Sequence, residues 1–425
     1  MGKNGENMSI PILYLDNTLT YGGAMLSLKN LLSALDRKRF EPVVISGQPA
    51  EVLARDFPAT TSYSRNIRLP WLHAPIYYRV RKWRLASLFP LNKFFSLWRF
   101  SYWFLVHDLP DSLGYWRIGR RHRIEIVHLN NILGSQLSGI LAAKLLGVPC
   151  VAHLRDFERN SVFTRSYARW IDHHIAISAA IRANLLELGV PAERISIVHD
   201  SLNPEEFSPQ KAKNEGVDED TAFARGHLTF GLFGRIVAWK GVREFVLAAA
   251  QVLIDHPGAR AFIVGSAPHP EDSYAREVTR LISELGLKAR ICMTGYRQKV
   301  VPLMGLMDVI VHASTRPEPF GMVVIEGMAL EKPVVATAAG GPLDIVVPEE
   351  TGLLVPPGDS QSLARAISTL LKGSSRRQEM GKRGRQRVEA LFSHQASARK
   401  IENIYADLLK PGFAGFEAQN LQELK

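Results

Sequence analysis

Two glutamates, Glu318 and Glu326, are the groups in this sequence best suited to binding a polar ligand. Gly321 keeps Glu318 outside a helix that we expect to start near Met322, and Glu326 lies about one turn inside it, at ~1.5 Å per residue. The unpaired N–H groups at this helix start, from Gly321 to Val323, favour an anion such as a phosphate. An alternative stays open, in which Glu318 only stabilises the helix dipole and Glu326 is solvated. It leaves unexplained why Glu326 lies on a largely apolar helix.

Two cations, Arg235 and Lys240, lie on one loop that joins an expected strand to the helix after it. Arginine offers a bidentate fork and lysine a point charge, a pair that suits a diphosphate. A solvated pair of surface charges is the alternative. The glycine pair Gly22-Gly23 has the same position after the first expected strand, where it lets an anion approach backbone N–H groups. By itself this pair is equally typical of a tight turn.

The positive charge of the chain is concentrated in one segment. Its 425 residues carry a net charge of +11, and twelve Lys and Arg against two acids lie within 65–123. Five of the seven Trp lie there too, a mixture typical of a surface that binds an anionic membrane or a lipid acceptor. An ordinary insertion with inward-facing aromatics is the alternative, and stacking on nucleic acid is another. We expect no nucleic acid partner, because the segment resembles no RNA-binding module.

The rest of the chain alternates between apolar strands and helices, which predicts two doubly wound α/β domains with parallel sheets. A polar stretch at 201–226 is expected to be the linker between them. The expected strands lie at 10–15, 43–46, 124–129, 150–154, 175–178 and 195–198, then at 228–233, 261–264, 291–294, 309–311 and 334–336. The expected helices lie at 24–35, 135–146, 242–255 and 271–285, with a last amphipathic one at 393–409.

The cysteine content and the apolar runs of the sequence indicate in which cellular compartment the protein is expected. Only two cysteines occur, Cys150 and Cys292, so a disulfide framework and a cysteine-based zinc site are both unexpected and a reducing compartment fits. The polar N-terminus lacks the apolar region of a signal peptide, and no uninterrupted apolar run reaches the ~18 residues of a spanning helix. We expect a cytoplasmic protein, peripheral on the inner face of the membrane.

The glycine pair, the cationic loop and the two glutamates, in this order and spacing, resemble the retaining glycosyltransferases of family 4. Their fold is GT-B, two facing Rossmann-like domains with parallel sheets and a C-terminal helix that docks back on the N-terminal domain. The resemblance covers ~10–60 and ~124–410, leaves out the basic aromatic segment and is also carried by stretches at 176–181, 199–207 and 340–355. It implies an acceptor-binding domain at 1–205 with an insertion at 65–123, a nucleotide-sugar domain at 206–390, and a helix and tail at 391–425.

The resemblance also implies roles for single residues. In catalysis, Arg235 and Lys240 would stabilise the departing diphosphate, Glu318 would contact hydroxyls of the donor sugar, and His153 would lie near the sugar and the acceptor. Asp344 stands where the family more often has Glu. The remaining positions would bind the nucleotide: the ribose at Glu326, the base at the backbone of Gly295 and Tyr296, and the phosphates at Gly22, Gly23, Gly321, Met322 and Val323.

These implications give one expected function with two alternatives. The expected enzyme is a retaining hexosyltransferase that moves a sugar from a nucleotide-diphosphate sugar to a hydroxyl of a lipid-linked or polysaccharide precursor. It needs no cofactor beyond this donor substrate, and no metal, because no Asp-x-Asp follows a strand. A nucleotide-sugar epimerase of the same architecture and a non-catalytic membrane-associated glycan-binding protein remain as alternatives.

Overall fold

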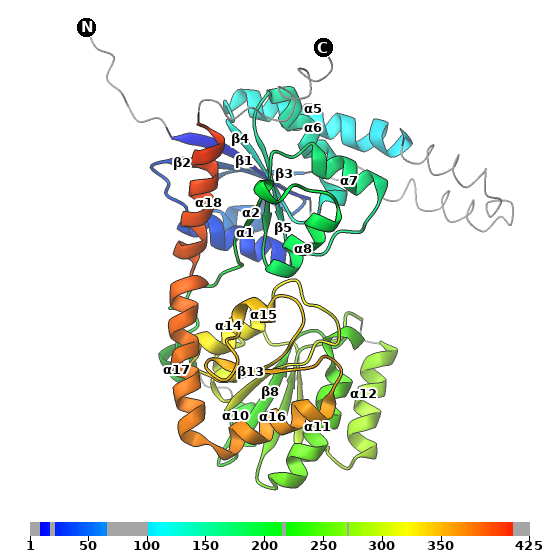
Figure 1. Ribbon diagram of the computed structural model, residues 1–425, viewed down its shortest axis with the longest axis vertical. Coiled ribbons are helices and arrows are strands. Elements are labelled where there is room, and N and C mark those ends of the chain that lie inside the picture. Colours follow the sequence, from blue (N-terminus) through cyan, green and yellow to red (C-terminus); the bar gives the residue numbers. More distant parts are fainter. Residues whose placement is uncertain (1–8, 18–21, 66–100, 215–217, 270–271, 411–425) are drawn as a thin grey trace, which may run out of the picture. The chain divides into compact units, whose positions relative to one another are not determined.

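The chain folds into two α/β units, each built around a parallel sheet (Figure 1). The computed structural model describes residues 9–17, 22–65, 101–214, 218–269 and 272–410. The first unit contains the described residues of Met1–Ala176, Arg182–Ser196 and Ala398–Lys425, and the second contains Ile177–Ile181 and Ile197–Ser397. The predicted domain boundaries, between 205 and 206 and between 390 and 391, stay a prediction.

The first unit has a sheet in the order β3-β2-β1-β4-β5-β6-β7, parallel from β3 through β6. All residues of its central strands β4 and β5 are buried, as expected for apolar runs that are covered on both faces. The strands are β1 (Ile10–Asp16), β2 (Phe40–Ser46), β3 (Thr61–Ser64), β4 (Ile126–Asn130), β5 (Cys150–Leu154), β6 (His173–Ala176) and β7 (Ile195–Ile197).

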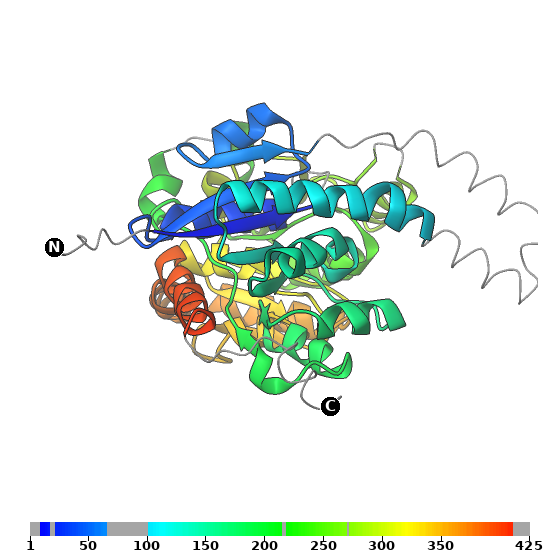
Figure 2. The same ribbon diagram turned by 90° about the horizontal axis from the view of Figure 1, so that it is seen from above.

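Helices cover this sheet, and α5 and α6 lie side by side in both ribbon views (Figures 1 and 2). The α-helix α6 ends at Gly147, whose φ of 69° is the left-handed conformation expected of a glycine stop. The helical elements are α1 (Gly23–Ala34), α2 (Ala50–Asp56), η3 (Phe104–Asp108), α5 (Leu109–Arg121), η4 (Leu133–Ser135), α6 (Leu137–Leu146), α7 (Val162–Arg169), α8 (Ala179–Glu187) and η5 (Ala192–Arg194).

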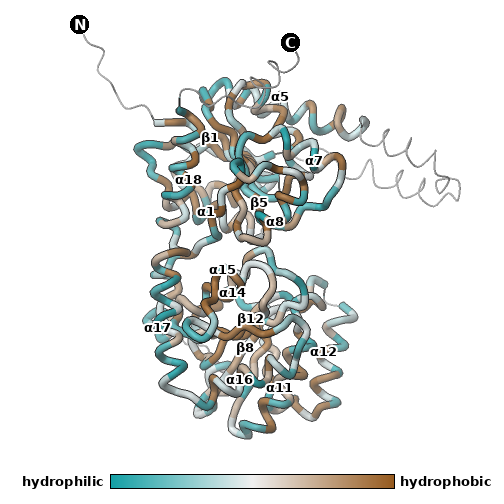
Figure 3. The backbone as a smooth tube through the Cα atoms, viewed as in Figure 1, coloured by the Kyte–Doolittle hydropathy of each residue, from teal (hydrophilic) through white to brown (hydrophobic). Residues whose placement is uncertain are grey.

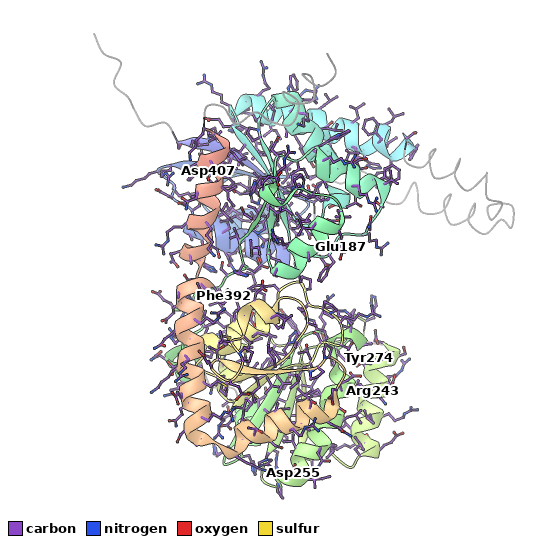
Figure 4. All side chains as sticks on the ribbon, viewed as in Figure 1. Glu187, Arg243, Asp255, Tyr274, Phe392 and Asp407 are labelled. Carbon is purple, nitrogen blue, oxygen red and sulfur yellow. The ribbon has the colours of Figure 1, made fainter. Side chains whose placement is uncertain are left out.

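The last helix, α18 (His394–Leu408), returns to the first unit, as the sequence predicts. The hydroxyl of Tyr405 lies 3.0 Å from the Tyr14 hydroxyl and 2.7 Å from Nδ1 of His128. A carboxylate oxygen of Glu402 accepts the N–H of Asp36 at 2.8 Å. These contacts attach the C-terminal half of the helix, where Figure 4 labels Asp407, to β1, to β4 and to the turn after α1.

The second unit has an all-parallel sheet in the order β10-β9-β8-β11-β12-β13. Its strands stand out as hydrophobic in Figure 3, whereas α17 (Ser374–Leu391) is mainly hydrophilic. On α11, the N–H of Arg243 donates to the Tyr274 hydroxyl of α12 at 3.1 Å, and both residues are labelled in Figure 4. The strands are β8 (Thr229–Phe233), β9 (Arg260–Val264), β10 (Ile291–Gly295), β11 (Val309–His312), β12 (Val334–Thr337) and β13 (Gly352–Val355). The helical elements are α9 (Pro209–Asn214), α10 (Asp218–Ala224), η6 (Ala238–Lys240), α11 (Val242–Asp255), α12 (Ser273–Glu284), α13 (Val301–Gly305), α14 (Met322–Ala329), α15 (Pro342–Ile345), α16 (Ser360–Lys372) and α17 (Ser374–Leu391).

The stretch at 201–226 is not the plain linker that its polar composition predicts. It contains α9 and α10, which pack on the second unit through a few small or apolar side chains. The Phe223 ring meets the Phe262 ring edge-on at 5.2 Å, and Ala212 approaches Gly305 so closely that a Cβ there would lie 2.5 Å from its own. The prediction is wrong because a helix in a polar stretch needs only a few apolar contacts on one side to pack on a domain.

Of the basic aromatic segment at 65–123, the residues at 66–100 lie outside the described part. The described part forms η3 and α5, and several large apolar side chains there are exposed to solvent. Trp103 is 49% exposed and Leu105 is 59% exposed. Within the described residues, no helix is both long enough and apolar enough to cross a membrane.

Candidate functional site

Glu318 and Lys240 form the centre of a polar cluster in the second unit. One oxygen of Glu318 accepts Nζ of Lys240 at 2.5 Å, and the other accepts the Ser314 hydroxyl at 2.7 Å and Nε2 of His312 at 3.2 Å. Burial alone would raise the pKa of Glu318, but the His312 hydrogen bond and the Lys240 charge outweigh it and lower this pKa to about 2. Glu318 is therefore a buried carboxylate that stays ionised.

The backbone around Glu318 is fixed by glycines. The Glu318 carbonyl accepts the N–H of Gly341 at 2.8 Å, which joins the loop before α14 to the start of α15. Gly340 has a φ of 75°, and a Cβ there would lie 2.1 Å from that same carbonyl oxygen. Any larger residue at position 340 would therefore displace the loop that carries the carboxylate.

The Gly234–Gly241 loop brings Lys240 to this carboxylate because it fits closely against the neighbouring strand ends. A Cβ on Gly241 would lie 1.8 Å from the carbonyl oxygen of Ala313, directly after β11. The carbonyl of Trp239 accepts the N–H of Thr315 at 2.8 Å. Arg235, at the start of the same loop, is exposed and makes no ion pair with any residue that the structure describes.

The helix α14 begins where the sequence predicts, with Gly321 as its N-cap at a φ of 107°. The first N–H groups of the helix, at Met322 and Val323, precede the first turn bond and are the usual unpaired donors of a helix start. Glu326 lies on the second turn, half-buried and without a hydrogen-bond partner among the described residues. Burial raises the pKa of Glu326 to about 7, although the Lys240 charge opposes this.

The expected base-reading residues lie at the end of a nearby strand. Gly295 ends β10 with a φ of 71°, and its carbonyl accepts the N–H of Gly265 at 2.9 Å. A Cβ on Gly265 would lie 1.9 Å from the Gly234 carbonyl oxygen, so the loops after β8, β9 and β10 touch one another. The Tyr296 side chain is 72% exposed. The second unit thus gathers its predicted residues along the carboxyl edge of one sheet, where ligands of such sheets bind.

The first unit holds the other predicted residues, Gly22, Gly23 and His153. Gly22 caps α1, both glycines are exposed, and a Cβ on Gly23 would meet no atom of the described residues within 4 Å. His153 lies on β5 and is 3% exposed. Asn130, at the end of β4, connects the two places, because its amide donates to the Ala24 carbonyl at 3.1 Å and it also binds Arg155, the second residue after His153.

Several polar residues of these clusters are missing from the sequence prediction. They share one position, at or just after the carboxyl end of a strand, which is the signal that would have found them. In the first unit they are Asp16, Asn130 and Arg155, and in the second they are His312, Ser314 and Thr337. Gln136, which directly precedes α6, is a further polar residue of the first cluster. Asp344 is engaged elsewhere, since one of its oxygens accepts the N–H of Ala179 at 2.7 Å and lies 3.2 Å from Nε2 of His199.

The sequence predicts no metal-binding residues in either unit. Within the described ranges, no group of three or more His, Cys, Asp and Glu side chains is arranged to hold a metal ion. The metal independence of any reaction stays a prediction.

Two protein-family models match the chain in succession. The model described as Glycosyltransferase Family 4 matches residues 21–206, and the model described as Glycosyl transferases group 1 matches residues 217–387. Among curated relatives, the capsular polysaccharide biosynthesis glycosyltransferase CapM of Staphylococcus aureus is 28% identical over 56% of this chain and 62% of its own length. The lipopolysaccharide core biosynthesis mannosyltransferase LpcC of Rhizobium leguminosarum bv. viciae is 28% identical over 72% of this chain and 86% of its own.

Solved structures share the fold. Anabaena HepE in complex with UDP has a TM-score of 0.73 at 23% identity, over 94% of this chain and 100% of that one. A glycosyltransferase from Rickettsia africae has a TM-score of 0.75 at 19% identity, over 95% and 100%. The two parallel sheets and these likenesses confirm the predicted GT-B fold. Matched in order, the two family models together cover most of the chain, which identifies it as a glycosyltransferase of the family-4 type.

Proposed function

We propose that this protein is a retaining glycosyltransferase that moves a hexose from a nucleoside-diphosphate sugar to a hydroxyl of a lipid-linked or glycan acceptor. The observation that carries the proposal is the Lys240–Glu318 pair just before α14, with Glu326 one turn into the helix and without a hydrogen-bond partner among the residues that the structure describes. An ammonium group, unpaired helix N–H groups and a free carboxyl in one place suit a diphosphate and a ribose together.

In the proposed reaction the cations act on the leaving group. Negative charge grows on the diphosphate as the bond between its oxygen and the anomeric carbon breaks, and Lys240 and Arg235 stabilise that charge. Lys240 is held in advance by Glu318, so it needs little reorganisation at the moment of transfer. Glu318 in turn contacts hydroxyls of the sugar, and Glu326 holds the ribose.

Retention of configuration follows if the acceptor attacks on the face from which the diphosphate leaves. The bond from the acceptor oxygen to the anomeric carbon forms there, and the acceptor proton passes to the departing phosphate oxygen. Every bond and proton of this step is accounted for without an enzymic base and without a metal ion. His153 lies near the sugar in this proposal, and the N–H groups at Gly22 and Gly23 approach the phosphates.

The relatives support the choice of substrates. HepE is solved with UDP and with UDP-glucose, which supports a uridine donor as the first to test. CapM is named for capsular polysaccharide and LpcC for the lipopolysaccharide core, which supports a glycan or lipid-linked acceptor. The exposed Trp103 and Leu105, within the strongly basic segment at 65–123, support attachment to an anionic membrane.

A donor screen followed by a transfer assay tests the proposal. A nucleotide sugar that binds only the folded protein raises its melting temperature, and the best donor is then incubated with glycan and lipid-linked acceptors. We expect a product with the donor's anomeric configuration by proton NMR, at a rate unchanged by EDTA. Conversion of the donor without any acceptor would indicate an epimerase, binding without turnover would indicate a glycan-binding protein, and an inverted anomer would remove the retaining mechanism.

Membrane attachment is tested separately by vesicle co-sedimentation. The protein should sediment with phosphatidylglycerol vesicles at low salt, and less with phosphatidylcholine vesicles or at high salt, because basic residues attract anionic lipid. The double variant Trp103→Glu, Leu105→Glu should lose this binding. Equal binding of both proteins would show that these side chains take no part.

A further inference from the structure

His153 has two ring nitrogens in different surroundings. It lies on β5, where its ring is almost completely buried. Its Nδ1 lies 3.3 Å from Nη2 of Arg155, whereas its Nε2 is buried and has no hydrogen-bond partner among the described residues. Such a buried, unpaired nitrogen costs free energy unless a bound molecule supplies its partner.

The Arg155 contact determines which nitrogen carries the proton. A guanidinium group has donors and no acceptor, so Nδ1 of His153 must accept in this contact. A neutral imidazole with an accepting Nδ1 carries its proton on Nε2. Burial, followed by the charge of Arg155 and the nearby His128, lowers the pKa of His153 well below its usual value, so the ring stays neutral.

Arg155 is itself held in place by a chain of polar groups at the strand ends. Its Nε donates to Oδ1 of Asn130 at 2.7 Å, and Nδ2 of Asn130 donates to a carboxylate oxygen of Asp16 at 2.6 Å. The side-chain amide of Gln136 donates to the Asn130 carbonyl at 2.7 Å. All four residues are buried, so the guanidinium cannot easily turn away from the imidazole.

We propose that Arg155 is a positioning residue that sets the tautomer of His153, so that the imidazole presents Nε2–H as a hydrogen-bond donor to an oxygen of the bound sugar. The identity of that oxygen rests on the proposed function, but the tautomer does not. In this form the ring donates at Nε2 and cannot take a proton there. His153 therefore orients or stabilises an oxygen, and the acceptor proton leaves by another route.

The tautomer is measured directly on the full-length protein. In nitrogen-15 NMR of labelled histidine, with the His153 signals assigned by their loss in His153→Gln, we expect a protonated Nε2 and an unprotonated Nδ1. The pattern should hold between about pH 5 and 8. A proton on Nδ1, or on both nitrogens, in the wild-type protein would overturn the inference whether or not any variant folds.

Variants separate positioning from a structural role. Arg155→Met should give a mixture of tautomers and lower kcat about 10- to 100-fold, while Arg155→Lys, which keeps a cationic donor, should recover part of both. Arg159→Met is the matched control, because Arg159 is exposed on the same loop, and it should change neither. An unchanged Nε2–H tautomer in Arg155→Met would remove the role of Arg155.

The outcomes also separate this inference from the proposed function. If the wild-type protein transfers no sugar, the proposed function fails while the NMR result still decides the tautomer. If it transfers sugar with His153 protonated on Nδ1, the proposed function stands and the inference fails.

Discussion

His153 in the first unit and His312 in the second are both buried histidines on strands, and they differ in their hydrogen-bond partners. Each is a buried histidine near the carboxyl end of a parallel strand. His312 donates from Nε2 to Glu318 and accepts from Thr337 at Nδ1, at 3.2 Å in both cases. His153 accepts from Arg155 at Nδ1, and its Nε2 has no partner in the described structure.

The same contrast separates the two glutamates. Glu318 is satisfied by three donors and has a lowered pKa, while Glu326 has no hydrogen-bond partner in the described structure and a raised one. Satisfied groups such as His312 hold the site together. Nε2 of His153 and the carboxyl of Glu326, which have no partner among the described residues, leave hydrogen-bonding capacity for a ligand. Residue type alone therefore does not distinguish a structural histidine or glutamate from one that binds substrate.

Lys240 has a partner within the site and also donors left for a ligand, so its loss should have the largest effect on turnover. One of its three N–H donors is used by Glu318, and its ammonium group lies 4.5 Å from the centre of the Trp239 ring, but it makes no second hydrogen bond among the described residues. Lys240→Ala removes a cation from the place where the diphosphate charge develops, so we expect kcat to fall about 100- to 1,000-fold. Steady-state kinetics measures this, with Lys288→Ala, an exposed lysine between α12 and β10, as the control. A fall within about fivefold would remove Lys240 from the proposed mechanism.

The two histidines should respond in opposite ways to truncation. His153→Ala should lower kcat about 10- to 100-fold with a smaller loss of stability than His312→Ala, because it removes one hydrogen bond, from Arg155 to Nδ1, and none at Nε2. His312→Ala removes a donor to a buried carboxylate and leaves Thr337 unpaired, so we expect a loss of about 2–4 kcal/mol in the free energy of unfolding. Urea denaturation and kinetics on both variants measure the contrast.

A control and a contrary result define this test. His269→Ala, at an exposed position, should change neither stability nor turnover. If His153→Ala destabilises the protein as much as His312→Ala does, His153 is a structural residue and the distinction between the two is lost.

The two glutamates should give stability profiles of opposite slope against pH. The pKa of Glu326 rises from 4.5 to about 7 on folding, so its stabilising contribution is complete below pH 4.5 and is lost as the pH rises to 7. The pKa of Glu318 falls from 4.5 to about 2, so its contribution is present above pH 4.5 and is lost as the pH falls to 2. We expect each change to be of the order of 1–3 kcal/mol.

Urea denaturation over a series of pH values measures both slopes. Glu326→Gln should flatten the curve between pH 4.5 and 7 and be more stable than wild type at pH 8, while Glu318→Gln should flatten it below pH 4.5. A wild-type curve that rises between pH 5 and 7 by the amount that Glu326→Gln removes would reverse the interpretation of Glu326.

Local sequence accounts for most of the fold and for part of the site. Apolar runs and glycine stops are local signals, so β8, α11 and the start of α14 were predictable. The edge strand β3, Thr61–Ser64, was missed because it is mostly polar and partly exposed. Lys240 and Glu318 were each predicted as binding residues, but their pairing joins positions 78 residues apart and depends on how the loops after β8 and β11 pack.

The hydrogen-bond partners of the site residues were less predictable from the sequence than the site residues themselves. Arg155 and His312 carry no distinctive motif, and their roles arise from which neighbour each sheet edge supplies. A pattern of strand ends indicates that polar groups meet there. It does not indicate which nitrogen of a histidine stays unpaired, because that depends on side-chain contacts between strands.

Thr337→Val should have the smallest effect. The substitution nearly keeps the side-chain shape and removes the hydroxyl that donates to Nδ1 of His312, leaving a buried acceptor unpaired at a cost of about 1–2 kcal/mol. The Glu318 carboxylate still requires a proton on Nε2, so the tautomer of His312 and the turnover should stay unchanged. Thr369→Val, on the exposed side of α16, is the control for stability. If Thr337→Val changes the tautomer of His312, the contact with Glu318 does not fix that tautomer by itself. A single contact with Arg155 would then no longer be a sufficient reason for the tautomer of His153.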